Sequence, residues 1–356
     1  MNTPLLDIYS DYLICSFGPT TATGLSALLA GSLSHDKITR FLSEEDFTSK
    51  DLWRLVKPLA RKIQSEEAVL IIDDSIEEKP YTDESELVCW HWDHCLNRTV
   101  KGINLLSALY HSQEVSLPIA FELIKKSAWE TDKKTGKQKR FCPVSKHTYF
   151  RQMVDTAIGN CLPFRYLLAD TWFGSAENMV YLKQECQKDF IFPLKANRKV
   201  ALSEQDKQQG VYVSVSSLLL EENTALAIWL EGVDFPLLLS RQVFTNKDGS
   251  QGVLYLVTSD LNLSALQMQT IYQKRWKVEV YHKSLKSNAS FSKSPTRTIR
   301  TQSNHFFACL WAYVKLETLR LQTKLNHFAM KAKIYQAALA SAYQELQGLK
   351  VRRLSA

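Results

Sequence analysis

Two short apolar runs that end in aspartate constrain this sequence more than any other feature. Residues 68–75 read AVLIIDDS, and residues 164–170 read FRYLLAD. Each run is short enough for a strand that is buried on both faces of a sheet. Acidic residues at the ends of such strands converge at one edge of an open sheet. The sequence therefore predicts an α/β fold in which the acids of both runs share a crevice.

The segments around these runs alternate between strand and helix patterns. The strand-like stretches GINLLSALYH and VSLPIAFELI follow the first run, and apolar residues at helical spacing cover 149–158. After the second run come a helical pattern over 177–187 and the strand-like stretch DFIFPLKA. This order predicts a mixed sheet flanked by helices.

Changes in pattern divide the chain into five expected regions. Strand-like stretches separated by polar turns such as Asn246–Gly249 indicate a β-rich insertion: VYVSVSSLLL, ALAIWLEG, FPLLLSRQVF and GVLYLVTS. The five regions are a helical N-terminal region (1–65), the first part of the α/β core (66–196), the β-rich insertion (197–262), the second part of the core (263–325) and a helical C-terminal tail (326–356).

The N-terminal region has the pattern of several short helices. Gly31 separates two apolar-periodic stretches, and Ser34 is placed to cap a second helix that would present Lys37 and Arg40 outward. This arrangement fits a DNA-binding helix-turn-helix, and it also fits two packed helices of any helical domain.

The net charge of +7 is concentrated in one stretch. Between Ile271 and Arg300, eight Lys and Arg residues accompany the single acid Glu279, which gives this stretch +7 and leaves the rest of the chain neutral. Such a basic band often binds nucleic acid, because cations that neutralise phosphates release counterions. A solvated helix face has the same composition, so charge alone leaves both interpretations open.

The basic stretch also has a helical pattern around Glu279. At about 100° per residue, six polar side chains share one helix face, whereas Val278, Tyr281 and Leu285 lie opposite and are expected to pack against a core. The polar face is expected to look outward or into a site, although by itself it also fits a salt-bridge network. Its members are Tyr272, Arg275, Glu279, His282, Lys283 and Lys286.

Aspartates at two strand ends and a glutamate on a later helix can form one carboxylate cluster. Carboxylate oxygens are the ligands that Mg²⁺ and Mn²⁺ prefer. Two such ions about 4 Å apart can activate the attacking oxygen and stabilise the leaving oxygen in phosphoryl transfer. The neighbouring Lys and Arg side chains are suited to bind phosphates on either side of the scissile bond.

The segment YQKRWKVEVYHKSLK, with Tyr272, Arg275, Glu279 and Lys286 at their particular spacing, resembles the insertion-sequence DDE transposases. That family carries a Y-R-E-K signature around its last acid, and the spacing here reproduces it without a gap.

The resemblance extends to both aspartate runs. In IIDDS, the aspartate directly before the serine matches the first acid of the family, which selects Asp74 over Asp73. In LADTWFG, Asp170 matches the second acid. A β-rich insertion between the second and third acids is also typical, so the resemblance covers roughly residues 65–320.

This resemblance implies a ribonuclease-H-like catalytic core that binds Mg²⁺, or Mn²⁺ in its place, through Asp74, Asp170 and Glu279. Such an enzyme nicks double-stranded DNA at a transposon end and joins the freed 3′ hydroxyl to target DNA. Family members act as homodimers that pair two ends. The resemblance implies phosphate contacts for the remaining polar face: Tyr272, Arg275, His282, Lys283 and Lys286.

Two rival functions remain open at this point. A transposase-derived protein can bind DNA as a regulator without cutting it, but the intact acids Asp74, Asp170 and Glu279 argue against that interpretation. A related nuclease would use the same carboxylates and metals and would differ only in the attacking hydroxyl.

Three further features bear on location and on competing sites. The seven cysteines include no CxxC pair, and no apolar run reaches about 18 residues, so we expect a bacterial cytoplasmic protein that joins the nucleoid when bound to DNA. The segment Cys89–Cys95 holds four potential zinc ligands but has no partner segment, which makes zinc the weaker alternative. The basic run over 133–140 is expected to be a solvated loop.

Overall fold

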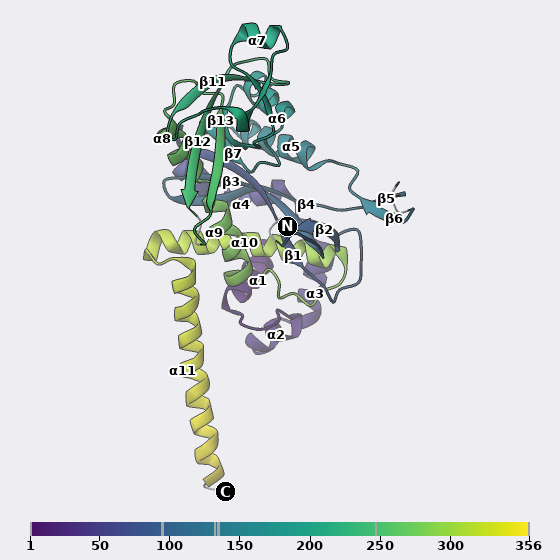
Figure 1. Cartoon of the computed structure of the whole chain (residues 1–356). Coiled ribbons are helices and arrows are strands. Elements are labelled where there is room, and N and C mark those ends of the chain that lie inside the picture. The colour runs from purple at the N-terminus through teal and green to yellow at the C-terminus, as the bar shows by residue number, and fades with distance from the viewer. Residues whose placement is uncertain (1, 94–95, 132, 134–135, 246–247, 355–356) are drawn as a thin grey trace. The chain divides into compact units, whose positions relative to one another are not determined.

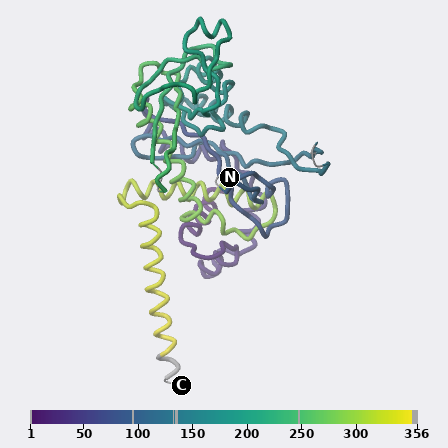
Figure 2. Tube along the Cα trace, viewed as in Figure 1, coloured from purple at the N-terminus to yellow at the C-terminus, as the bar shows by residue number. Residues whose placement is uncertain are grey.

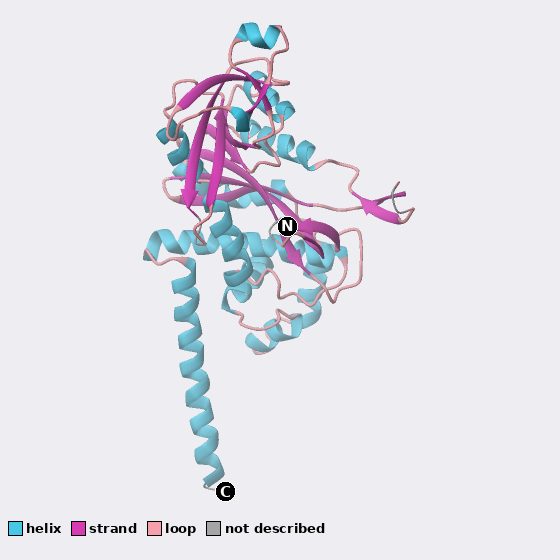
Figure 3. Ribbon diagram, viewed as in Figure 1, coloured by secondary structure: helices cyan, strands magenta, loops and turns pink. Residues whose placement is uncertain are grey.

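The computed structural model describes residues 2–93, 96–131, 133, 136–245 and 248–354 (Figure 1). The chain forms two compact units. Unit 1 comprises Met1–Val56, Ile76–Asn104 and Val280–Ala356, and unit 2 comprises Lys57–Ser75 and Leu105–Glu279. Two strands and two helices have residues in both units. Figure 3 colours the helices cyan and the strands magenta.

Unit 1 is built around one long buried helix, α10 (Ile299–Thr323). Helices α1 (Thr3–Cys15) and α3 (His35–Glu44) pack against it. The ring of Phe47 stacks on that of Phe307 at 4.3 Å, and the Asn304 side chain donates to the Leu42 carbonyl at 2.8 Å. The other helical segments in this unit are α2 (Ala22–Leu28), the first part of α4 (Ser49–Ile63), the latter part of α9 (Trp276–Asn288) and α11 (His327–Leu354).

One N-terminal helix, α3, begins where the sequence predicts. The Ser34 hydroxyl accepts a hydrogen bond from the Lys37 amide at 3.3 Å, so Ser34 is the N-cap of α3 as predicted. Lys37 and Arg40 line a shallow hollow on this helix together with Asn2. These contacts fit packed helices, and a role in reading DNA stays a prediction.

His305 lies at the centre of unit 1, fully buried on α10. Burial, together with the smaller effect of the charge of Lys79, lowers its pKa from the ordinary value of 6.5 to about 4. Because the unfolded chain takes up this proton more readily, stability is fully present above about pH 6.5 and is lost as the pH falls toward 4. From this residue alone we expect a loss of about 3 kcal/mol.

Urea unfolding at pH 7, 5.5 and 4.5 measures this effect. His305→Gln should lower stability at pH 7 but should flatten the dependence on pH relative to the natural chain. Because other buried histidines remain, the variant should keep part of the pH dependence. Equal pH dependence in both proteins would contradict the assignment of this effect to His305.

A large mixed sheet forms the centre of unit 2. Its strand order is β10-β9-β11-β12-β13-β8-β7-β1-β3, with β4 paired to the other edge of β3. Strands β1 and β7 pair in parallel, as do β7 and β8, whereas β8, β13, β12 and β11 are antiparallel in turn. The bounds are β1 Val69–Glu78, β3 Arg98–Ser112, β4 Val115–Leu123, β7 Tyr166–Ala169, β8 Asp189–Leu194, β9 Lys199–Ala201, β10 Val213–Ser214, β11 Ala225–Leu230, β12 Leu237–Thr245 and β13 Gln251–Thr258.

Helices cover this sheet and bury its apolar side chains. Helix α5 (Lys146–Gly159) packs on β4, and α8 (Ala265–Gln273) packs on β8, β12 and β13. Phe150 of α5 stacks on Phe173 at 5.2 Å, and both rings are fully buried. Shorter helical segments are α6 (Ala176–Val180), the π-helix η1 (Tyr181–Glu185), α7 (Glu204–Gln208) and the 3₁₀ helix η2 (Val215–Ser217). The predicted mixed sheet flanked by helices, with a ribonuclease-H-like arrangement and a helical C-terminus, is confirmed.

Three details differ from the sequence predictions. The expected strand over 211–220 is only β10, after which η2 and irregular chain follow. The expected solvated loop over 133–140 contains part of a hairpin, β5 (Ala128–Thr131) with β6 (Gln138–Phe141). In unit 1, β2 (Cys89–Asp93) pairs with the first half of β3. Asn246 and Lys247, part of a predicted turn, lie outside the described residues.

Candidate active site

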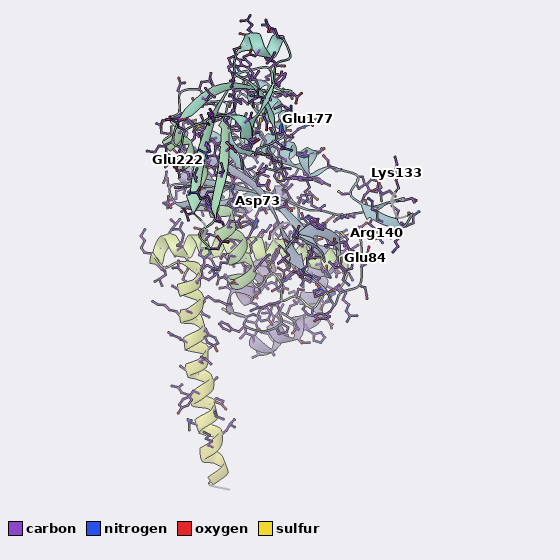
Figure 4. The ribbon with its side chains drawn as sticks, viewed as in Figure 1. Asp73, Glu84, Lys133, Arg140, Glu177 and Glu222 are labelled. Atoms are coloured by element: carbon purple, nitrogen blue, oxygen red, sulfur yellow. The ribbon has the colours of Figure 1, made fainter. Side chains whose placement is uncertain are left out.

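The parallel register of β1 and β7 brings their carboxyl ends to the same edge of the sheet. Ile72 pairs with Ala169, so the next residues along the two strands are Asp73 and Asp170. Residues 69–72 of β1 and all of β7 are buried, as expected for strands covered on both faces. Asp73 can be located near the middle of the ribbon in Figure 4. The predicted convergence of acids from the two runs is therefore observed.

The two adjacent aspartates of β1 point toward different partners. Asp73 is 3.6 Å from the Arg275 guanidinium, whereas Asp74 accepts a hydrogen bond from Nζ of Lys146 at 2.8 Å. Arg275 also lies 3.3 Å from Glu279, so it bridges two acids. Successive side chains of a strand alternate in direction, which explains why the neighbours separate in this way.

The expected continuous helix from Tyr272 to Lys286 is interrupted. Helix α8 ends at Gln273, Lys274 and Arg275 form a turn, and α9 (Trp276–Asn288) begins after it. In the turn the amides bond to the third preceding carbonyl, as Arg275 does to Tyr272 at 2.9 Å. This tighter winding is that of a 3₁₀ segment. The break directs Arg275 toward the carboxylates while Glu279 stays on α9.

Tyr272 lies against the strand end that carries Asp170. Its hydroxyl donates to the Ala169 carbonyl at 3.3 Å, and the Arg275 guanidinium is 5.8 Å from the ring centre. Burial raises the pKa of Tyr272 above its ordinary value, so the phenol stays protonated near neutral pH. Tyr272 thereby helps to hold Arg275 in place.

The carboxylates of unit 2 repel one another. Burial raises the pKa of Asp73 well above its ordinary value, and the charges of Asp170, Asp74 and Glu279 raise it further against the opposing effect of Arg275. Burial also raises the pKa of Asp170. A shared site of several acids, one of them buried, favours protons or cations.

The backbone after β7 partly offsets this repulsion. The Asp170 carboxylate accepts hydrogen bonds from the amides of Trp172 at 3.0 Å and Phe173 at 3.3 Å. These two bonds lower the pKa of Asp170 while burial raises it. They also fix the direction of the side chain, which is a requirement for a precise site.

The second half of α9 belongs to unit 1, where the remaining predicted residues lie. Lys283 is exposed, with its Nζ 5.3 Å from the Phe328 ring, and Nζ of Lys286 donates to the Ile76 carbonyl at 2.9 Å. His282 is only 6% exposed, so the expected outward position does not hold for this residue. The opposite face is buried as predicted at Val278, Tyr281 and Leu285.

Sequence reasoning missed three residues near Asp170. Lys146 at the start of α5 contacts Asp74, and His147 stacks on Trp172 with the ring centres 6.0 Å apart. The stacked pair lines a hollow of about 330 Å³ with Lys195 and Arg198. Lys146 follows Ser145, the N-cap of α5, but nothing in its local sequence marks it as a partner of an acid on a distant strand.

The Cys89–Cys95 segment provides no evidence for the zinc alternative. Cys89 and His91 are buried and 3.2 Å apart, and His94 and Cys95 lie outside the described residues. Within the described part of the chain, no three Asp, Glu, His or Cys side chains stand close enough together to hold a metal ion.

The donor set in unit 2 nevertheless suits Mg²⁺ chemically. Asp74, Asp170 and Glu279 offer only oxygen ligands, and the repulsion of Asp170 by Asp74, and of Asp73 by all three, is the condition that a divalent cation relieves. In the structure, Arg275 and Lys146 partly neutralise these acids through ion pairs of 2.8–3.6 Å. The residues present therefore fit a hard divalent cation in charge and in ligand type.

Comparison with known proteins yields two overlapping family matches. A family model described as DDE superfamily endonuclease matches residues 2–211, and one described as transposase DDE domain matches residues 138–315. A search of curated proteins found no match. Among the described helices, none is long and apolar enough to cross a membrane.

Proposed function

Because the chain belongs to the DDE superfamily of endonucleases and transposases, we propose that it is the transposase of an insertion sequence. It binds the transposon ends and catalyses metal-dependent DNA cleavage followed by strand transfer, that is, DNA transposition and recombination. One observation carries the proposal: acids at the ends of two adjacent parallel strands meet Arg275 and Lys146 in one unit.

The proposed roles follow from charge and position. Asp74, Asp170 and Glu279 would hold Mg²⁺, with Mn²⁺ able to replace it. Bound there, two such ions supply activation of the attacking oxygen and stabilisation of the leaving oxygen. Tyr272 and Arg275 then orient the phosphates around the scissile bond, because an arginine presents a rigid fork of donors to phosphate oxygens.

Residues of unit 1 extend the proposed DNA contacts. Lys283 and Lys286 follow Glu279 on the same helix and offer further positive charge to the phosphate backbone. His282 keeps its proposed place in the signature, but its burial makes a supporting role within the helix more suitable than a direct contact. We further propose a homodimer that pairs two ends in the bacterial nucleoid.

Strand transfer is tested with a duplex that carries the inverted repeat flanking the gene, a supercoiled target plasmid and Mg²⁺. The full-length protein should nick the repeat at its end and then join the freed 3′ hydroxyl to the plasmid. Glu279→Ala should bind the duplex but neither nick nor join it, whereas Glu222→Ala, at an exposed position in unit 2, should do both.

Other outcomes separate the rival functions. Nicking without joining, when a pre-nicked end is also supplied, would replace the transposase proposal with a nuclease. Binding without any cleavage by the natural chain would instead indicate a DNA-binding regulator.

A further inference from the structure

The hairpin β5–β6 stands apart from the packed part of unit 2. We call residues 125–141 the arm. The Cα trace leaves the sheet after β4, runs out to the hairpin and returns to α5 (Figure 2). Its four backbone pairs join Ala128–Thr131 to Gln138–Phe141, and most of its described side chains are exposed. A two-stranded hairpin without a core is only marginally stable, so stability alone gives no reason for such an extension.

The charge of the arm is strongly positive. Its 17 residues include seven Lys and Arg and two acids, a net charge of +5. Lys139 forms an ion pair with Glu130 at 3.3 Å. The side chains of Lys133 and Lys137 are exposed to solvent. Lys133 and Arg140 are labelled on the arm in Figure 4. A projecting, positively charged element is the shape and charge that complement a phosphate backbone.

Trp129 adds an aromatic surface to this charge. The indole is 55% exposed, and the Arg140 guanidinium lies 4.2 Å from its ring centre. The two residues are cross-strand partners in the hairpin, which keeps the guanidinium over the ring. A large, exposed and positioned aromatic side chain between cations is suited to pack on sugars or bases.

The arm is linked by a short segment to the carboxylates. Its last residue, Phe141, is five residues before Lys146, which contacts Asp74. Five residues span at most about 18 Å. One turn of a DNA duplex is ~34 Å long. The base of the arm can therefore be no more than about half a helical turn away from a DNA phosphate that is bound beside the carboxylates.

We propose that the arm binds the backbone of duplex DNA beside the cleavage position, with Lys133 and Lys137 on phosphates and Trp129 against deoxyribose. This proposal rests on the proposed function, because the proposed function places the scissile phosphate at the carboxylates. It assigns the arm to affinity and positioning, and the arm has no part in the chemical step.

The test uses full-length protein and a 40-base-pair duplex of mixed sequence without divalent metal. The dissociation constant is measured by fluorescence anisotropy at several salt concentrations. Lys133→Gln with Lys137→Gln should weaken binding at least about tenfold at 0.1 M salt and reduce the salt slope by about two. Trp129→Ala should weaken binding about fivefold, and Trp129→Phe should restore most of the loss.

A matched pair of substitutions removes the same charge elsewhere. Lys50→Gln with Lys57→Gln, on exposed positions of α4, should leave both the affinity and the salt slope close to those of the natural chain. The arm proposal is overturned if the two double variants behave alike. It is also overturned if the arm variant keeps its DNA affinity and instead changes the molecular mass of the protein in solution, which would indicate a protein interface.

Nicking in Mg²⁺ separates this proposal from the proposed function. At DNA concentrations below the dissociation constant, the arm variants should nick more slowly than the natural chain, because less duplex is bound. If the natural chain does not nick DNA at all while the arm variants still lose affinity, the proposed function fails and the arm remains a DNA-binding element.

Discussion

Asp170→Asn should reduce Mg²⁺-dependent DNA cleavage at least about 1,000-fold while leaving DNA binding nearly unchanged. Loss of one metal ligand removes several kcal/mol of transition-state stabilisation, and each 1.36 kcal/mol corresponds to about tenfold in rate. Asparagine keeps the size of the side chain, so the packing of the β7 end should survive. Nicking of an end-bearing duplex, followed over time on a denaturing gel, measures the rate.

The control for this prediction is a carboxylate of unit 2 outside the site. Glu222→Gln changes the same charge at an exposed position and should leave the rate within about twofold, as is usual for surface substitutions away from a site. Asp74→Asn and Glu279→Gln should match Asp170→Asn. A cleavage rate for Asp170→Asn close to that of the natural chain would remove Asp170 from the proposed ligands.

Arg275→Ala should destabilise the metal-free protein by about 3 kcal/mol, which is the usual cost of removing one partner of a buried ion pair. Its guanidinium is 14% exposed and the Asp73 side chain 12%, and the same guanidinium bridges to Glu279. Without it, acids that already repel one another lose their nearest cation. Urea unfolding in EDTA measures the difference.

Mg²⁺ should restore part of the stability lost in Arg275→Ala, because a ligand that binds only the folded state raises its stability. The matched control is Arg54→Ala, which removes the exposed ion pair with Asp51 and should cost less than about 1 kcal/mol with no response to Mg²⁺. Equal stability of Arg275→Ala and the natural chain in EDTA would show that the acids do not depend on this cation.

Strands β1 and β7 could be predicted because burial on both faces leaves a short apolar run, whatever the partner strand is. The same reasoning placed Asp170 at a strand end. It could not decide how Asp73 and Asp74 divide their contacts, because that depends on the register between β1 and β7 and on Lys146 from α5.

Other features escaped prediction for different physical reasons. The break at Arg275 is a 3₁₀ turn between two helices. Such a turn rotates the following side chains only slightly around the helix axis, so the spacing of the apolar residues still matches one continuous helix. The arm has no buried face, so it lacks the alternation by which strands are recognised. His282 was expected to face outward or into a site, and its burial was not foreseen, because periodicity identifies helix faces and does not show how deeply a helix is inserted.

The pairing of the acids with Arg275 and Lys146 has a consequence for the order of assembly on DNA. In the free protein these two cations are held by Asp73, Glu279 and Asp74. A divalent ion held by Asp74, Asp170 and Glu279 would release Lys146 and leave Arg275 with Asp73 alone, which makes both cations more available to phosphates. DNA that attracts the two cations would in turn leave the acids more strongly negative. Each ligand should therefore raise the affinity for the other by the same factor. The protein would then respond to metal and DNA together more strongly than to either alone.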